Sequence, residues 1–306
     1  MKTLYQQKME QLGLQEFNLF EIELLKTERF ITELSAKYAT NILLDERTFL
    51  LRTIKRMINL MRSVWVIFKT TTDRASMMIL ARSIIDLNAI ICFLFQHVKN
   101  DEERALRLRL FYLDGVRTRL KISKEPIKER NPNYISEEEY SATLTQMEEA
   151  KQADLAAIDD LEQLIVNSPL YAQMHPEILE KAIWKFKKIN SKKAYTLTEL
   201  YEIATGDKKM ARFEQEYLSH YVHGIAISDF QFPVINETNP AFSLNICCSI
   251  LNHLEPIIKV WFPSDYDALE SSFKPILAQY VISGLNPEEL KSYIQDKELE
   301  HKAGKA

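Results

Sequence analysis

The apolar segment Ile79–Phe95, which reads ILARSIIDLNAIICFLF, carries an arginine and an aspartate that could do chemistry together. Arg82 and Asp86 are four residues apart, so on a helix they share a face and can form an ion pair. A helix that is apolar on nearly all sides is expected to be buried, and buried charges persist only when they are paired and hydrogen-bonded. Two interpretations follow: an internal salt bridge that fixes how neighbouring helices dock, or a guanidinium that Asp86 holds ready for phosphate or another anion.

A second polar group stands in the segment Ser219–Gly224, which reads SHYVHG. His220 and His223 are three residues apart on one face of an expected helix that ends at the glycine, and the C-terminus of a helix favours a charged imidazole. Three interpretations stay open: structural histidines held by hydrogen bonds, acid–base or phosphate-contact chemistry, and metal binding. Metal binding is the weakest, because a zinc site needs at least one further ligand and no nearby cysteine or acid has the right spacing.

These two segments resemble an uncharacterised all-helical bacterial family whose hallmarks are an Arg-Ser-x-x-acid helix and a Ser-x-x-x-His segment. That family is similar to the wider HEPN group of nucleotide-binding domains. Many HEPN proteins are metal-independent ribonucleases of toxin, defence or RNA-processing systems, with a site that two protomers share. The resemblance therefore implies an all-α, HEPN-like bundle that forms a homodimer and binds RNA or a nucleotide. The residues that match the hallmarks are Arg82, Asp86, Ser219 and His223.

The resemblance also implies a reaction. His223, as general base, would take the proton of the RNA 2′-hydroxyl, which contributes roughly 10²–10⁴-fold to a rate. Arg82, oriented by Asp86, would stabilise the charge that develops on the phosphorane. His220 and Ser219 complete the candidate catalytic set, and neither a metal ion nor another cofactor is expected.

One departure from the HEPN pattern bears on this reaction. The usual motif has four to six residues between an arginine and the histidine, but the corresponding positions before His223, residues 216–218, read Glu-Tyr-Leu. Either Arg82 supplies the guanidinium from another helix, or the ribonuclease chemistry is absent. The rival hypothesis is a non-enzymatic interaction or regulatory protein whose Arg/Asp/His cluster only fixes the bundle.

Two basic segments could neutralise phosphates. Residues 104–130 hold nine basic and three acidic residues (9 − 3 = +6), and residues 181–193 hold six lysines and no acid. Such stretches bind nucleic acid with an affinity that falls as salt rises, although an ordinary solvated helix face has the same composition. Trp184 and Phe186 suit packing anchors better than base platforms. The candidate nucleic-acid contacts are Lys181, Lys185, Lys188, Arg117 and Arg119.

Composition excludes several classes of protein. Glycine makes up 6 of 306 residues, against roughly 7% on average, which excludes collagen-like and low-complexity chains and argues against β-sandwiches and barrels. The net charge of 39 − 43 = −4 gives no global attraction to nucleic acid or anionic membranes. Three cysteines without a CxxC pair make a disulfide framework unexpected, and a polar N-terminal segment predicts cytoplasmic residence.

The elements that position these residues are predicted to be helices throughout, in an all-α, multi-helix bundle. Helices are expected over about 14–34, 45–68, 73–97 and from 101 onward. Arg82, Asp86 and Asn88 argue against a membrane span in the third of these, because charged groups at the bilayer centre are costly.

Start and stop signals divide the rest of the chain. Ser136 with Glu139, and Thr196 with Glu199, form two predicted capping boxes, and Gly206 is expected to end the helix that the second box begins. We expect N-terminal bundle helices over 1–123, a helical insertion over 124–195 and bundle-completing helices over 196–306.

Overall fold

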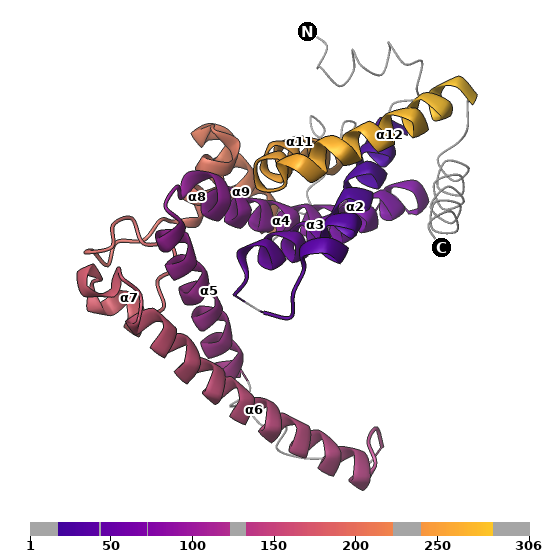
Figure 1. The fold of residues 1–306 in the computed structure, drawn as a ribbon. Helices are drawn as coiled ribbons and strands as arrows, with labels where there is room; N and C mark the ends of the chain where they lie inside the picture. The colour runs from indigo at the N-terminus through magenta and orange to yellow at the C-terminus, as the bar shows by residue number, and fades with distance from the viewer. Residues whose placement is uncertain (1–17, 43, 72, 123–132, 223–239, 284–306) are drawn as a thin grey trace, which may run out of the picture. The chain divides into compact units, whose positions relative to one another are not determined.

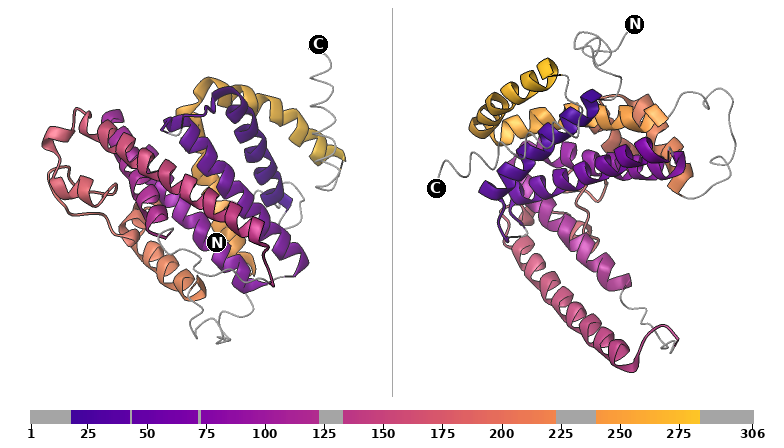
Figure 2. Two further views of the ribbon diagram at one scale, coloured as in Figure 1. Left: turned by 90° about the horizontal axis from the view of Figure 1, so that it is seen from below. Right: turned by 90° about the vertical axis from the view of Figure 1, so that its right-hand side faces the viewer.

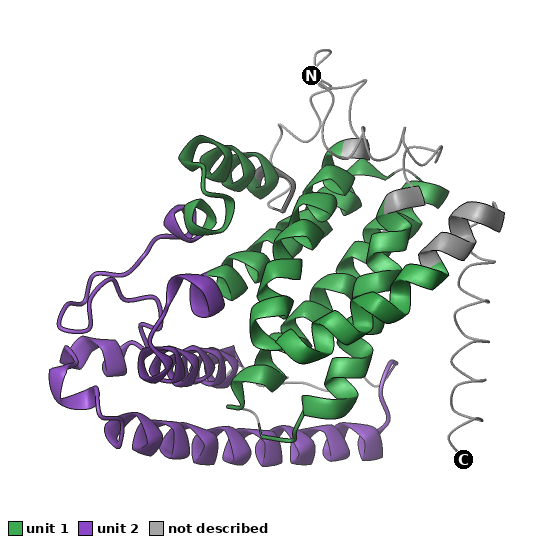
Figure 3. Ribbon diagram, turned by 45° about the horizontal axis from the view of Figure 1, so that its top comes forward, with its two compact units in different colours: residues 1–92, 201–306 green, residues 93–200 purple. Residues whose placement is uncertain are grey.

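The computed structural model describes residues 18–42, 44–71, 73–122, 133–222 and 240–283, and within these ranges it is all-helical apart from one isolated bridge, Phe186 to Ala194 (Figure 1). The prediction of an all-α protein is therefore confirmed for the described part of the chain. The chain divides into two compact units, residues 1–92 with 201–306, and residues 93–200 (Figure 3). The predicted insertion, 124–195, lies inside the second unit, which also includes residues 93–123.

The first unit is a bundle built around one apolar helix. Its members are α2 (Asn18–Tyr38), α3 (Glu46–Thr70), α4 (Arg74–Cys92), α9 (Lys208–Val222), α11 (Pro240–Trp261), α12 (Pro263–Ser283) and part of α8 (Leu197–Thr205). Helix α4 packs against α3, α9 and α11, so apolar side chains around much of its surface find partners (Figure 2). Ala81 and Ile84 are completely buried, and so is Ile54 on the facing helix α3. This burial is why α4 is apolar around most of its circumference.

Local signals in the sequence set where these helices begin and end. The Asp45 carboxylate accepts a hydrogen bond from the Thr48 amide at 2.7 Å and caps α3. The predicted capping box before α8 is present, because the Thr196 amide donates to Glu199 at 2.7 Å and the Glu199 amide donates to Thr196 Oγ1 at 3.2 Å. Gly206 follows α8 with a φ of +70°, the left-handed conformation that ends helices.

The second unit is a helical hairpin with a short irregular segment. Its elements are the π-helix η1 (Phe93–His97), α5 (Asp101–Ile122), α6 (Glu137–Val166), the 3₁₀ turn η2 (Tyr171–Gln173) and α7 (Pro176–Glu180). Helices α5 and α6 pack side by side (Figure 2). Ser136 and Glu139 form the predicted capping box at the start of α6.

The helix Arg74–His97 is long and apolar enough to cross a membrane by length and composition, with a mean hydropathy of 2.0 over its most apolar window. However, 61% of that window is buried within the protein. A core helix of a bundle meets the same criteria, and the packing of α4 against α3, α9 and α11 is that of a core helix.

Candidate functional site

Arg82 and Asp86 form the ion pair that their spacing predicts. Arg82 Nε donates to Asp86 Oδ2 at 3.3 Å, across one turn of α4. The Arg82 side chain is 12% exposed and that of Asp86 is 39% exposed. The pair therefore lies at the edge of the core, with its carboxylate side open to solvent.

Helix α9 supplies two further acceptors to the same guanidinium. Arg82 Nη1 donates to the backbone oxygen of Gln215 at 3.1 Å and to Ser219 Oγ at 3.3 Å. Gln215 and Ser219 are one turn apart on the side of α9 that packs against α4. The structure thus brings together three of the predicted site residues, Arg82, Asp86 and Ser219, across 137 positions of sequence.

Tyr201 on α8 is a member of this site that the sequence analysis missed. It is completely buried, its hydroxyl donates to Asp86 Oδ1, and the Arg82 guanidinium lies over its ring, 5.1 Å from the centroid. Burial, followed by the negative charge of Asp86, raises the pKa of Tyr201 far above its ordinary value. Tyr201 therefore keeps its proton at all physiological pH values and acts as a hydrogen-bond donor. We call Arg82, Asp86, Tyr201 and Ser219 the Arg82 cluster.

A titratable carboxyl lies beside the cluster. Glu214 occupies the flank of α9 between Ala211 and Leu218, both of which are completely buried. Burial raises the pKa of Glu214 to about 7, and the negative charge of Glu214 in turn helps to raise the pKa of Tyr201. The helical spacing of Ala211 and Leu218 was the available signal that this acid points towards the core.

The two histidines are not placed by the structure. His223 lies outside the described residues, and His220 is described only as part of the backbone of α9. The predicted convergence of the Arg82 guanidinium and the His223 imidazole therefore stays a prediction. Among the described residues, no group of three or more His, Cys, Asp and Glu side chains could hold a metal ion.

The predicted nucleic-acid contacts of α5 are engaged in ion pairs within the second unit. Arg117 pairs with Glu162 at 2.7 Å and also donates to the backbone oxygens of residues 179 and 180. Arg119 pairs with Asp154 on α6. These two arginines fasten α5 to its neighbours, although the Arg119 side chain is still 67% exposed.

The lysine-rich segment 181–193 folds back on itself and is anchored by a buried arginine. Arg107 donates to the backbone oxygens of Trp184 at 2.9 Å and Phe186 at 2.8 Å, and its guanidinium lies 3.7 Å from the centre of the Phe186 ring. Trp184 and Phe186 are 8% and 1% exposed, so both rings pack inside the unit rather than stacking bases. Lys181 pairs with Glu177, whereas Lys185 is half-buried and Lys188 is exposed.

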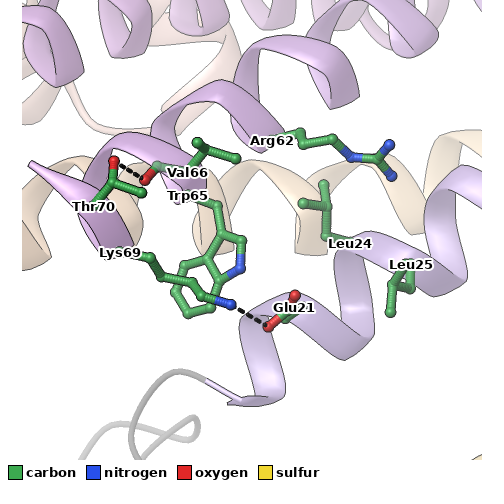
Figure 4. A pocket seen from close by; sticks show the side chains of 8 residues that line it. All are labelled: Glu21, Leu24, Leu25, Arg62, Trp65, Val66, Lys69 and Thr70. Carbon is green, nitrogen blue, oxygen red and sulfur yellow. Dashed lines mark hydrogen bonds and ion pairs between the residues drawn. The ribbon is translucent and has the colours of Figure 1, made fainter. Parts of the chain in front are cut away.

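A pocket of about 250 Å³ lies elsewhere in the first unit, between α2 and α3 (Figure 4). Trp65 and Leu24 line its apolar side, and Glu21 and Lys69 face one another at 3.8 Å. No residue of the Arg82 cluster lines this pocket. The cluster is therefore a partly exposed polar site rather than part of this cavity.

Comparison with known families decides which group the chain belongs to. Residues 47–232, well over half of the chain, match DUF5677, a family of unknown function. The chain belongs to the DUF5677 family. The matched range includes Arg82, Asp86, Tyr201, Glu214 and Ser219. Comparison with curated proteins and with solved structures gives no match.

Proposed function

We propose that this DUF5677 protein binds RNA or a nucleotide through a phosphate at the Arg82 cluster. The proposal rests on the Arg82 guanidinium, which is held in place from several sides while its nitrogen Nη2 stays available for a ligand. Arg82 uses Nε and Nη1 for its bonds to Asp86, Gln215 and Ser219, and Nη2 donates no hydrogen bond to the described residues. A guanidinium has five N–H donors, and those on Nη2 suit a phosphate oxygen.

Preorganisation supports this function. The partners of Arg82 come from α8, α9 and its own helix, so the guanidinium is oriented before a ligand arrives. A site that is already ordered loses less conformational entropy on binding. Ser219 Oγ accepts from Arg82, which leaves its hydroxyl proton free to donate to the same anion.

The charge balance of the cluster also allows an anion to bind. The negative charge of Asp86 is offset by the Arg82 guanidinium and by the hydrogen bond from Tyr201. Glu214 holds its proton for about half of the time at neutral pH, because burial raises its pKa to about 7. The local charge near Arg82 is therefore less negative than the sequence alone indicates.

The proposed reaction is metal-independent cleavage of RNA. His223 takes the proton of the 2′-hydroxyl, the 2′-oxygen forms a bond to phosphorus, and the bond from phosphorus to the 5′-oxygen breaks. The 5′-oxygen leaves with a proton from water, and the Nη2 hydrogens of Arg82 stabilise the charge on the phosphorane. A bacterial, HEPN-like protein of a toxin or defence system, cytoplasmic and acting as a homodimer, would use this chemistry.

Binding of single-stranded RNA, measured by fluorescence anisotropy in EDTA, tests the proposal. We expect Arg82→Ala to weaken binding at least tenfold and Arg82→Lys to restore it only in part, because lysine lacks the planar fork. Arg52→Ala, which removes an exposed arginine of α3, is the matched control and should bind as the wild type does. Equal affinity of the wild type and Arg82→Ala would overturn the proposal.

Cleavage needs a separate assay, because a binding site need not be catalytic. We expect the wild type to cut single-stranded RNA in EDTA and His223→Ala to bind RNA without cutting it. Equal cleavage by both proteins, or cleavage by neither, would remove the catalytic part and leave the binding part standing.

One observation favours a second candidate, a non-enzymatic protein whose cluster is structural. The Arg82 side chain is only 12% exposed and its recorded bonds all go to the chain itself. In that case Arg82→Ala lowers the free energy of unfolding while the wild type shows no affinity for RNA.

A further inference from the structure

A pair of stacked aromatic rings, one exposed and one half-buried, lies on α9, the helix that also carries Ser219. Phe213 and Tyr217 are one turn apart, with ring centroids separated by 5.2 Å and ring planes only 11° from parallel. Phe213 is 46% exposed, which is unusual for a phenylalanine on a helix that packs in a bundle. We call Phe213 and Tyr217 the aromatic pair.

The surrounding residues fix the orientation of this pair. Phe242 on α11 meets both rings edge-on, with interplanar angles of 86° to each. Arg74 Nη2 donates to the Tyr217 hydroxyl at 2.6 Å. Since the rings are held from two sides, a planar group that stacks on Phe213 meets a surface that is already ordered.

Positive charge accompanies the aromatic pair along the same face. Lys209, Phe213 and Tyr217 follow one another at intervals of four residues, so they lie in line on the helix surface. Lys209 is exposed and has no ion pair with the described residues. Glu216, three residues after Phe213, pairs with Arg212 at 2.7 Å, which partly offsets its repulsion for an anion.

We propose that the aromatic pair is a stacking platform for a base of single-stranded RNA, with Lys209 bound to a neighbouring phosphate. The inference rests on the proposed function and specifies its substrate class as an unpaired strand. Every base has a π-face, so an aromatic platform with a flanking cation binds a single strand without reading its sequence. Bases in a duplex are already stacked on one another and are not available to Phe213.

Phe213 and Ser219 are six residues apart, which is about 9 Å along a helix axis and roughly 120° around it. The aromatic pair and the Arg82 cluster therefore lie on different sides of α9 and would make separate contacts with RNA.

The test compares two RNA oligonucleotides of equal length, one oligouridylate and one abasic. We expect Phe213→Ala to weaken binding of oligouridylate roughly 5- to 150-fold, the effect of losing one stacked base, and to leave the affinity for abasic RNA unchanged. Phe213→Trp should keep the wild-type preference. Met210→Ala is the matched control, because Met210 is also 46% exposed on the same helix but has no ring.

The outcomes separate this inference from the function on which it rests. Suppose that Arg82→Ala binds RNA weakly while Phe213→Ala binds both oligonucleotides as Met210→Ala does. The stacking platform is then wrong, and the proposed phosphate site at Arg82 is supported. If Phe213→Ala loses oligouridylate while Arg82→Ala does not, the platform stands and the Arg82 site is wrong. If the wild type binds neither oligonucleotide, both are overturned. Thermal unfolding of each variant checks that it is folded, which is expected of Phe213→Ala and Met210→Ala because both side chains are half-exposed.

Discussion

The hydroxyl of Tyr201 donates a hydrogen bond to the carboxylate of Asp86, which stands 115 positions earlier in the chain. This bond joins α8 to α4, and the Tyr201 ring at the same time supports the guanidinium of Arg82. One buried side chain therefore orients both members of the ion pair.

Replacing Tyr201 with phenylalanine isolates the contribution of that hydroxyl. The ring stays beneath Arg82, but Asp86 loses a donor, and we expect the free energy of unfolding to fall by about 1–2 kcal/mol. Urea denaturation measures the change. Tyr195→Phe is the control, because the Tyr195 hydroxyl has only a 3.4 Å contact with His97, and it should cost less than Tyr201→Phe. An equal cost for both variants would contradict the assigned role of the hydroxyl.

Glu214 gives the protein a specific pH dependence. Burial raises its pKa from 4.5 to about 7, so between these two values the folded protein holds a proton that the unfolded chain has released. The contribution of Glu214 to stability is therefore present at low pH and is lost as the pH rises from about 4.5 to 7. Glu214→Gln should remove this decline and unfold at higher urea than the wild type at pH 8.

The control for this experiment is Glu216→Gln, on the next turn of the same helix. The Glu216 side chain is 59% exposed, so its loss should leave the decline between pH 4.5 and 7 in place. A wild type whose urea midpoint does not fall over this interval would show that the Glu214 carboxyl is solvated.

Arg107 should be the most sensitive basic residue of the second unit. Lysine carries its donors on a single nitrogen and lacks the planar fork by which Nη1 and Nη2 reach the backbone oxygens of Trp184 and Phe186, so it would leave a buried acceptor there unsatisfied. We expect Arg107→Lys to cost about 2–4 kcal/mol in the unfolding of this unit. Arg109→Lys, which alters a single bond from a half-buried arginine to the backbone oxygen of Leu164, should cost less than 1 kcal/mol. Hydrogen exchange at residues 184–195 reports the difference, and equal protection in both variants would refute it.

The three cysteines should be almost inert in the folded protein. Burial raises the pKa of Cys92 and Cys248 to about 12 and that of Cys247 still further. At pH 8 about one thiol in ten thousand is then a thiolate, the form that reacts. We expect no fast reaction with a disulfide reagent at pH 8, and full reaction of all three in guanidinium. A rapidly reacting thiol in the native protein would place that cysteine at the surface.

The sequence was sufficient to predict those contacts of the site that join neighbouring residues of one helix. The i, i+4 spacing of Arg82 and Asp86 predicts their ion pair because both lie on one helix. Capping boxes at Ser136 and Thr196 likewise depend on neighbours within one turn, and the structure confirms both. Ser219 was selected by a family resemblance and lies within hydrogen-bonding distance of Arg82.

The remaining features depend on packing between distant segments. Nothing in the residues around Tyr201 indicates that its hydroxyl meets Asp86, since that contact requires α8 to lie against α4. Arg107 belonged to a segment interpreted as a basic surface, yet it is 3% exposed. The local sequence of α5 does not distinguish a solvated arginine from one that a later segment, 184–195, will cover.

The first unit is made of two stretches of chain separated by the 108 residues of the second, 93–200. At a synthesis rate of about 5–20 residues per second, α2, α3 and α4 leave the ribosome roughly 6–34 s before α9 and α11 are complete. During that interval the apolar helix α4 lacks two of the partners that bury it. Nascent chains should therefore depend on a chaperone that shields α4 until translation reaches the last third of the message.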